Sequence, residues 1–409
     1  MTIVLFEDEG FVDLLPLACW RTVFELLVGR KILMDRISQR LGVTIGGVWV
    51  RDWMVDVARQ RCGAPANEPL AKPCTLVNGR WLVEDRLKFP PSPCVGVIGE
   101  NEIAYINCDV QLAAKLSALD MLSSDRRRDA LAGVPRVDAP GHLLRYPWDA
   151  IRRLPELLLA DCEDADPSIE SPLDPRTVVD GRQALRVGER VRIHPTAVID
   201  ANTGPVFIGD DVTVGAYAVL EGPLYLGPGS KVSPHAWLHG GNAIGPVCKV
   251  GGEVTGCIMH GYSNKQHDGF LGHAYVGSWV NIGAGAVNSN LKNTYTHVSV
   301  PINARPIDSG QLFFGAVIGD HAKIGINSTL PTGAVVGFAA SVAGTAMLPK
   351  FIPSFSWVNG EQIRRGDHLK ALDTAATVMA RRNVEMTDEE VELFLGLHDR
   401  LGQYETRNL

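Results

Sequence analysis

The sequence of 409 residues lacks three features that would point directly to a function class: Cys-x-x-Cys pairs, a block of basic residues and a positively charged leader. Its eight cysteines are scattered, which argues against a zinc ribbon or a thioredoxin-type site. The 46 aspartates and glutamates outnumber the 39 lysines and arginines, so we expect neither nucleic acid nor a membrane as a partner. The apolar start, Ile3–Phe6, turns acidic at once, which favours a first strand over a signal peptide. We expect a cytoplasmic protein that acts on small molecules.

Long hydrophobic runs of the membrane-spanning kind are absent as well. Residues 324–349 carry no charge, but glycines and a proline interrupt them, and their large aliphatic residues recur at every sixth position. Because an α-helix has no six-residue period, this stretch is not predicted to cross a membrane.

The same period of six recurs upstream and determines the fold of the second half. Aliphatic residues recur at intervals of eighteen in two series, Ile208, Leu226 and Ile244, and Val214, Val232 and Val250. Three six-residue units per eighteen-residue turn describe a triangular parallel β-solenoid, in which each aliphatic side chain points into the prism. The pattern is lost over residues 256–275 and again over residues 288–314. We expect two loops to leave the prism there, and such loops are natural places for a site.

Helical patterns follow the solenoid. Residues 367–384 predict an amphipathic helix, and Thr387 with Glu390 forms a capping box before a second helix. We expect these helices to cover the end of the prism or to pack on a neighbouring subunit.

The first half of the chain reads differently. Short apolar runs such as residues 44–50 and 102–107 alternate with helix-like stretches such as residues 32–41 and 111–122, which is typical of an α/β layer structure. The acidic, proline-containing segment 161–167 is interpreted as a linker. The expected domains are therefore an α/β domain with its linker in 1–185, a β-solenoid in 186–355 and helices in 356–409.

A motif in the solenoid carries a resemblance. The run Gly-His-Ala-Tyr-Val-Gly at 272–277 precedes Asn-Ile-Gly-Ala-Gly at 281–285 and a second asparagine at 290. This arrangement resembles the acetyltransferase half of the bifunctional N-acetylglucosamine-1-phosphate uridyltransferase/glucosamine-1-phosphate acetyltransferase family, whose solenoid is a left-handed parallel β-helix. The resemblance implies that His273 is the general base, that Tyr275 contacts the substrate and that Asn281 and Asn290 surround the amino sugar. It also implies acetyl-CoA as the acyl donor and a homotrimer.

The N-terminal half is similar to the sugar nucleotidyltransferase-like domain of a divergent branch of this group. The similarity rests on Leu-Pro-Leu at 15–17, Arg21, Glu25-Leu26 and Tyr-Pro-Trp-Asp at 146–149. The Gly-x-Gly-Thr-Arg loop of the better-known uridyltransferases is absent from the sequence.

Transfer from an NTP to a sugar 1-phosphate needs cations for the phosphates and Mg²⁺ held by a carboxylate. Arg21, Arg30 and Lys31 are the candidate phosphate contacts, and Asp8 is the candidate metal ligand. Asn78 occupies a place where active relatives hold a metal-binding aspartate.

The expected function is sugar nucleotide biosynthesis: N-acetylation of an amino sugar phosphate combined with nucleotidyl transfer. One alternative keeps only the acyltransferase and makes the N-terminal domain a degenerate nucleotide-binding or regulatory module. Another is a solenoid that binds partners without catalysis. A zinc hydratase is a further rival because eight of the eleven histidines lie in the solenoid. That group carries His-x-x-x-x-His, and His235 and His239 are one residue too close to match it.

Overall fold

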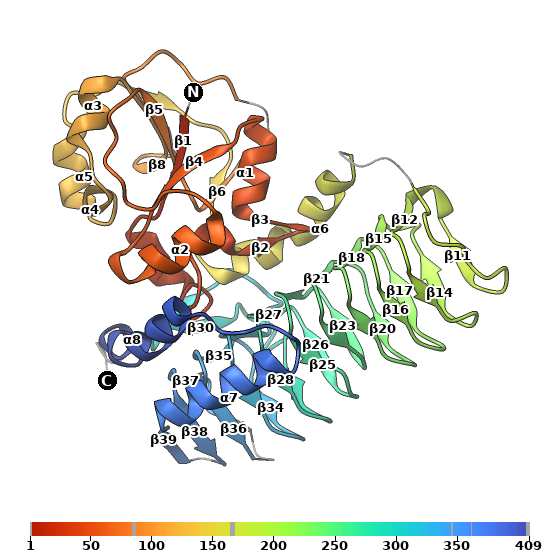
Figure 1. Cartoon of the computed structure of the whole chain (residues 1–409). Helices are drawn as coiled ribbons and strands as arrows, with labels where there is room; N and C mark the ends of the chain where they lie inside the picture. The colour runs from red at the N-terminus through yellow and green to blue at the C-terminus, as the bar shows by residue number, and fades with distance from the viewer. Residues whose placement is uncertain (1, 84–86, 164–167, 345–346, 361, 406–409) are drawn as a thin grey trace.

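The computed structural model describes residues 2–83, 87–163, 168–344, 347–360 and 362–405. An N-terminal α/β domain lies over one flank of a long β-solenoid, and the C-terminal helices run back toward that domain (Figure 1). The expected fold class, an α/β domain followed by a left-handed parallel β-helix and C-terminal helices, is confirmed. None of the helices in the described ranges is long and apolar enough to span a membrane.

The N-terminal domain is built on a six-stranded sheet in the order β4-β1-β5-β8-β7-β9. Strands β4, β1 and β5 run parallel to one another, and β8 runs antiparallel to both β5 and β7. The strands are β1 (Thr2–Phe6), β4 (Ile45–Trp49), β5 (Cys74–Asn78), β7 (Cys94–Ile98), β8 (Glu102–Cys108) and β9 (Arg136–Asp138). Two small ribbons join β2 (Leu27–Val28) to β3 (Lys31–Ile32) and β6 (Trp81–Leu82) to β10 (His142–Leu143).

Helices cover this sheet, and the last of them reaches the solenoid. They are α1 (Leu33–Leu41), α2 (Val55–Cys62), α3 (Val110–Lys115), α4 (Ala118–Met121), α5 (Ser124–Ala130) and α6 (Pro147–Glu163), with short 3-10 turns at Glu9–Leu14, Val23–Glu25 and Asp52–Met54. A further 3-10 turn, Arg182–Ala184, lies between β11 and β12 of the solenoid. Figure 1 shows α6 running between the N-terminal sheet and the solenoid strands.

Three parallel sheets form the faces of the solenoid. The first face holds β12 (Leu185–Val187), β15 (Val206–Ile208), β18 (Leu224–Leu226), β21 (Asn242–Ile244), β24 (Ile258–Met259), β27 (Tyr275–Val276), β32 (Ala316–Ile318), β35 (Ala334–Val336) and β37 (Phe351–Ile352). The second face holds β13 (Arg192–Ile193), β16 (Thr213–Val214), β19 (Lys231–Val232), β22 (Lys249–Val250), β25 (Asn264–Lys265), β28 (Asn281–Ile282), β33 (Lys323–Ile324), β36 (Ser341–Ala343) and β38 (Ser356–Asn359), with β39 (Gln362–Arg365) antiparallel at its edge. The third face holds β11 (Val178–Asp180), β14 (Val198–Asp200), β17 (Val219–Glu221), β20 (Trp237–Leu238), β23 (Glu253–Thr255) and β26 (Phe270–Gly272), followed by the separate pair β29 (Val287–Asn288) and β34 (Thr329–Leu330).

The aliphatic series read from the sequence stack inside this prism. Ile208 aligns with Leu226 and Leu226 with Ile244, and all three side chains are buried. Stacking of like side chains on successive coils makes the core continuous. Parallel pairing begins with the bridge of Ile169 to Val187 and continues at β11, upstream of residue 186, the expected start of the solenoid.

The first expected interruption, residues 256–275, does not leave the prism. The chain continues through β24, β25 and β26 in register with the coil before it. The eighteen-residue spacing is lost because the coil is shorter here, with Met259 aligned to Ile244 fifteen positions before it. In addition, Lys265 aligns with Val250 and is buried at the position of an aliphatic residue, with Nζ donating to the His267 carbonyl. The prediction of a loop here was wrong, because a shortened coil with a polar side chain at the inward position breaks the sequence period without leaving the prism.

The second expected interruption does leave the prism. Between β29 and β32 the chain forms an antiparallel hairpin, β30 (Ser299–Ile302) with β31 (Arg305–Asp308). Its apolar residues join the buried cluster of the N-terminal domain, and Asn303 donates from Nδ2 to the Val12 carbonyl at 2.8 Å. The hairpin therefore connects the solenoid to the N-terminal domain.

The expected linker is partly structured. Asp161 belongs to α6 and is buried, and its carboxylate accepts a hydrogen bond from Arg36 at 2.8 Å. Residues 164–167 of that segment lie outside the described residues. The linker interpretation of Asp161 is therefore corrected, because its charge is satisfied within the N-terminal domain.

The C-terminal helices are α7 (His368–Ala380) and α8 (Asp388–Glu405). The capping box is confirmed, with the Thr387 amide donating to Glu390 at 3.1 Å and the Glu390 amide donating to Thr387 at 3.3 Å. Phe394 of α8 stacks edge-on against Trp20 of the N-terminal domain and Phe338 of the solenoid. Helix α8 thus packs at the interface between the two domains, in addition to covering the prism.

Candidate active site

His273 lies at the corner between the third and first faces, in a cavity of about 370 Å³. The solenoid, the returning end of the excursion after β31 and helix α6 form its walls. The lining residues are Trp148, Ile151, Arg152, Pro155, Gly240, Gly241, Thr255, Gly256, His273, Gln311, Leu312, Phe313 and Phe314. The loop expected in this region therefore lines the cavity, and α6 supplies a second wall from the N-terminal domain.

The ring of His273 is held on two sides. Nδ1 lies 2.9 Å from Nδ2 of Asn290, and the ring of Phe313 stacks on the imidazole at 5.5 Å between centroids. Burial lowers the pKa of His273 below its usual value, so the ring is neutral at pH 7. The sequence motif thus brings together two of its expected residues, His273 and Asn290.

Glycines next to the ring are structurally required. A Cβ added to Gly256 would lie 2.9 Å from the imidazole of His273, and one added to Gly272 would lie 2.6 Å from Nδ2 of Asn290. Both substitutions would push the pair apart, so these glycines keep the space that the pair occupies.

Tyr275 does not reach this cavity. Successive side chains in a strand point to opposite faces, and Val276 takes the inward position, so Tyr275 points out of the first face toward the N-terminal domain. Its hydroxyl donates to the Leu27 carbonyl at 2.8 Å and only 1% of the residue is exposed. The structure gives Tyr275 a contact between domains where the resemblance implied a substrate contact.

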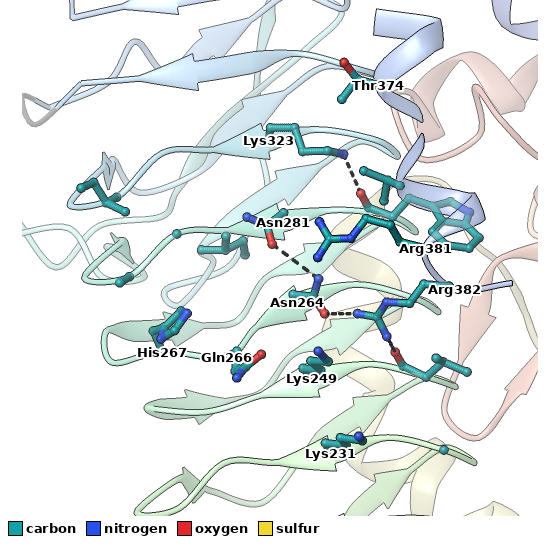
Figure 2. Close-up of a pocket in the computed structure, with 18 of the residues that line it drawn as sticks. Lys231, Lys249, Asn264, Gln266, His267, Asn281, Lys323, Thr374, Arg381 and Arg382 are labelled. Carbon is teal, nitrogen blue, oxygen red and sulfur yellow. Dashed lines mark hydrogen bonds between the residues drawn. The ribbon is translucent and has the colours of Figure 1, made fainter. Parts of the chain in front are cut away.

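Asn281 lies on a different face from His273. It belongs to β28 on the second face, is exposed and accepts a hydrogen bond from Nδ2 of Asn264 at 3.4 Å. It lines a groove beneath α7 that Figure 2 shows. Within one chain, Asn281 and Asn290 therefore do not surround a common ligand.

Arg21 is buried at the domain interface. Its guanidinium pairs with the carboxylate of Asp320 and donates to Ser278 Oγ at 3.0 Å. His260 lies against the same guanidinium. Burial lowers the pKa of this histidine well below its usual value, and the positive charge of Arg21 lowers it further. A phosphate at Arg21 would have to displace Asp320.

The other two candidate phosphate contacts also have protein partners. The guanidinium of Arg30 lies 3.5 Å from the centroid of the Phe207 ring and donates to the Asp161 carbonyl at 3.0 Å. Lys31 Nζ donates to the side chain of Gln39. The ring partner of Arg30 lies in the solenoid, and the partner of Lys31 lies in α1.

Asp8 is engaged on both carboxylate oxygens. Arg80 donates to them at 2.7 and 2.6 Å, and Asn78 donates from Nδ2 at 2.8 Å. Burial opposes ionisation, but the Arg80 guanidinium and the hydrogen bonds outweigh it and lower the pKa of Asp8. Across the described ranges, no three histidine, cysteine or acidic side chains gather to hold a metal. Since Mg²⁺ prefers carboxylate oxygens free of other donors, these residues do not fit the expected magnesium site.

Two sets of residues escaped sequence reasoning. Trp148 and Arg152 line the His273 cavity from α6, and no local pattern signals that contact across domains. The second set is a group of cations on the second face and α7. Part of it is visible in the sequence, because Lys231 and Lys249 precede aligned valines eighteen residues apart.

The first half of the chain matches a known protein family. Residues 3–166 match the sequence model of a family described as sugar nucleotidyl transferase. Among curated proteins, the chain is 30% identical over 259 residues to the bifunctional protein GlmU of Heliobacterium modesticaldum, covering 58% of this chain and 47% of that protein. It is 26% identical over 212 residues to the GlmU of Synechococcus sp. strain CC9311, covering 48% and 38%. The chain thus spans less than half the length of these curated relatives.

Among solved structures, the chain is similar to a UDP-N-acetylglucosamine acyltransferase from Campylobacter jejuni. The identity is 14% and the TM-score 0.29, over 55% of this chain and 95% of that one. An acyltransferase of the same description from Bacteroides fragilis matches at 17% identity and a TM-score of 0.28, over 58% and 86%. The resemblance to the bifunctional family is confirmed: residues 3–166 match the sugar nucleotidyl transferase family, and about half of the chain is similar to GlmU proteins.

Proposed function

We propose that this chain is a transferase of sugar nucleotide biosynthesis, and that its solenoid transfers the acetyl group of acetyl-CoA to the amine of an amino sugar phosphate. The observation that carries the proposal is the contact of His273 with Asn290 inside a cavity walled by the solenoid and α6. A cytoplasmic homotrimer remains the expected form of the protein.

His273 serves as the general base in this reaction. The amine nitrogen attacks the thioester carbonyl carbon and forms the C–N bond, His273 takes the amine proton, and collapse of the tetrahedral intermediate breaks the C–S bond. The ring then returns the proton to the leaving thiolate. Burial lowers the pKa of His273, so the ring is ready to accept a proton near neutrality.

Asn290 positions the ring. With Nδ2 against Nδ1, the neutral ring carries its proton on Nε2. With the amide turned by half a rotation, Oδ1 accepts the proton of Nδ1 and leaves Nε2 as the base. The reaction uses this second arrangement, which exchanges two atoms of similar size.

Arg152 supplies the charge for the phosphate of the acceptor. It lines the His273 cavity from α6, about half of its side chain is exposed, and its ion pair with Asp149 is long at 3.6 Å. A guanidinium in this state is free to form a bidentate contact with a phosphate.

For the N-terminal domain, the family match supports nucleotidyl transfer, whereas the contacts of Asp8 favour the module that binds a nucleotide without turnover. We adopt the nucleotide-binding module without turnover, because the Arg80 guanidinium occupies the Asp8 carboxylate that the metal would need. A melting-temperature shift with UTP or dTTP, without formation of a nucleotide sugar from N-acetylhexosamine 1-phosphate, is the expected result. Formation of a nucleotide sugar would restore the transferase alternative.

Mass spectrometry of the products tests the acyl transfer. Purified protein is incubated with acetyl-CoA and a panel of hexosamine phosphates, and His273→Ala should lower the rate by about 10²- to 10⁴-fold. His235→Ala is the matched control, because His235 is an exposed solenoid histidine with a similar left-handed backbone, φ +60° against +49°. Full activity of His273→Ala would refute the proposal.

The pH profile tests the role of Asn290. Asn290→Asp keeps an oxygen against Nδ1 and adds a negative charge that raises the pKa of His273, so activity should persist with its acid limb moved to higher pH. Asn290→Ala should lower kcat without that movement. Equal profiles for both variants would show that Asn290 does not position the ring.

A further inference from the structure

Two buried cysteines face each other at one end of the N-terminal sheet. Cys74 begins β5 and Cys108 ends β8, and the register of these antiparallel strands places the two residues directly opposite each other. Residues in this relation have Cα atoms about 4.5–5.5 Å apart, within the range of about 4.4–6.8 Å that a disulfide needs. Both thiols are free in this structure. The backbone can therefore hold a disulfide between Cys74 and Cys108 without rearrangement.

The two thiols interact, and this interaction distinguishes Cys74 from the other cysteines. A hydrogen bond from Cys108 lowers the pKa of Cys74 against the effect of burial, and the same contact raises the pKa of Cys108. Because the thiolate is the reactive form of a cysteine, Cys74 is the more reactive thiol of the pair. Burial raises the pKa of the other five cysteines whose side chains the structure describes: Cys19, Cys62, Cys94, Cys248 and Cys257.

The third cysteine of the sheet does not join the pair. Cys94 of the neighbouring strand β7 aligns with Asn107, the residue before Cys108. Successive side chains of a strand point to opposite faces, so Cys94 lies on the other side of the sheet and belongs to a different buried cluster. Across the described ranges, no three histidine, cysteine or acidic side chains gather to hold a metal. A metal site therefore does not account for the pair.

The pair lies close to solvent although both residues are buried. Cys74 is 3% exposed and Cys108 is fully buried, but Pro73 is exposed and Val110 is 46% exposed. Both cysteines stand at strand ends, where local opening costs less free energy than global unfolding. A small oxidant can reach the two thiols through such an opening.

We propose that Cys74 and Cys108 are a redox modification site, at which hydrogen peroxide produces a reversible disulfide. The Cys74 thiolate attacks one peroxide oxygen: an S–O bond forms, the O–O bond breaks, and the departing hydroxide takes up the proton that Cys74 released. The sulfur of Cys108 then attacks the resulting sulfenic acid, so that the S–S bond forms, the S–O bond breaks and a second water leaves with the Cys108 proton. Two thiols are oxidised and one peroxide is reduced to two waters.

The proposal does not rest on acyl transfer, because both cysteines lie in the N-terminal domain and neither lines the His273 cavity. It assigns to this domain a chemistry that is separate from nucleotide binding. A dithiol such as dithiothreitol returns the pair to its reduced form by thiol–disulfide exchange.

Mass spectrometry of the full chain tests the proposal. Hydrogen peroxide at pH 7 should remove two hydrogens from the chain, and alkylation after denaturation should label two fewer of its eight cysteines. Proteolysis without reductant should release one peptide pair, joined through Cys74 and Cys108. Dithiothreitol should restore both thiols.

A second measurement is the unfolding of the oxidised chain in urea. Because a disulfide restricts the unfolded chain, oxidation should lower the unfolding equilibrium constant of the N-terminal domain by roughly 10²-fold, and dithiothreitol should reverse the change. Cys74→Ala and Cys108→Ala should each abolish both the cross-linked peptide and this difference between oxidised and reduced chain. Cys94→Ala is the matched control, since Cys94 is also 3% exposed and lies on the adjacent strand, and it should retain both.

Three results would overturn the proposal. Peroxide could leave all the thiols free, or a cross-linked peptide could join a different pair. Cys74 could also become a sulfinic acid while Cys108 stays free, which would show that the second thiol does not reach the first.

Discussion

The ion pair between Arg21 and Asp320 joins the N-terminal domain to the solenoid, and its removal should destabilise the whole molecule. The carboxylate of Asp320 is fully buried, and 7% of the Arg21 side chain is exposed. Burial raises the pKa of Asp320, and the charge of Arg21 opposes that rise. The carboxylate therefore depends on Arg21 to stay ionised at the interface.

Arg21→Leu leaves a buried carboxylate without a cation, a change that costs about 3–5 kcal/mol of unfolding free energy. Asp320→Leu leaves the buried guanidinium unpaired at a similar cost. The double variant Arg21→Leu/Asp320→Leu replaces both charges by apolar groups, so it should lose much less than the sum of the single variants. Their coupling energy, the difference from additivity, measures the pair directly.

Urea unfolding followed by circular dichroism gives these free energies. Arg176→Leu is the control, because Arg176 forms an exposed pair with Asp174, and exposed pairs contribute little to stability. We expect no measurable change in its unfolding midpoint.

The reasoning is refuted if Arg21→Leu unfolds at the same urea concentration as the parent chain. If that variant also loses the melting-temperature shift with UTP or dTTP, then Arg21 contacts phosphate, as the sequence alone predicts, and the pair with Asp320 is incidental.

Two further predictions concern buried charges. Burial raises the pKa of Glu405 to about 7. Its stabilisation is therefore complete below the unfolded pKa near 4.5 and is lost as pH rises to 7, a change on the order of 3 kcal/mol that Glu405→Gln should abolish in urea midpoints measured from pH 4.5 to 7.5. Burial lowers the pKa of Lys265 to about 8. Its cost is therefore present below pH 8 and disappears as pH rises toward 10.5, so Lys265→Met should raise the unfolding free energy at pH 7 by about 1–3 kcal/mol, and a loss of stability in Lys265→Met would contradict this account.

The six-residue period predicts most of the solenoid because each coil buries its aliphatic residues at the same positions, as the alignment of Val214 with Val232 and Val250 illustrates. The same reasoning fails at Lys265, where a cation takes the inward position and hydrogen bonds to a carbonyl that no sequence pattern reveals. The six-residue period therefore predicts the triangular shape of a coil better than it predicts how many coils the solenoid contains.

For the candidate site too, the sequence predicts some positions correctly and others wrongly. His273 and Asn290 of the motif lie together because they occupy the same corner of the prism, one coil apart in the chain. Tyr275 and Asn281 stand in the same motif, but the alternation of side chains and the three faces of the prism direct them elsewhere. Closeness in sequence to a catalytic residue is therefore weak evidence of a shared site in a solenoid, where residues six apart lie on different faces.

Charges are the hardest residues to interpret from sequence, because the partner decides the role. Arg21 has a carboxylate 299 positions away in the chain, so its candidacy as a phosphate contact could be weighed only after folding brought the two together. Lys231 and Lys249 show the converse: their spacing of one coil was present in the sequence, and the register turns it into adjacent positive charges. A cation whose partner is found in the fold stabilises the fold, and a cation that the fold leaves unpaired beside another is available to a ligand.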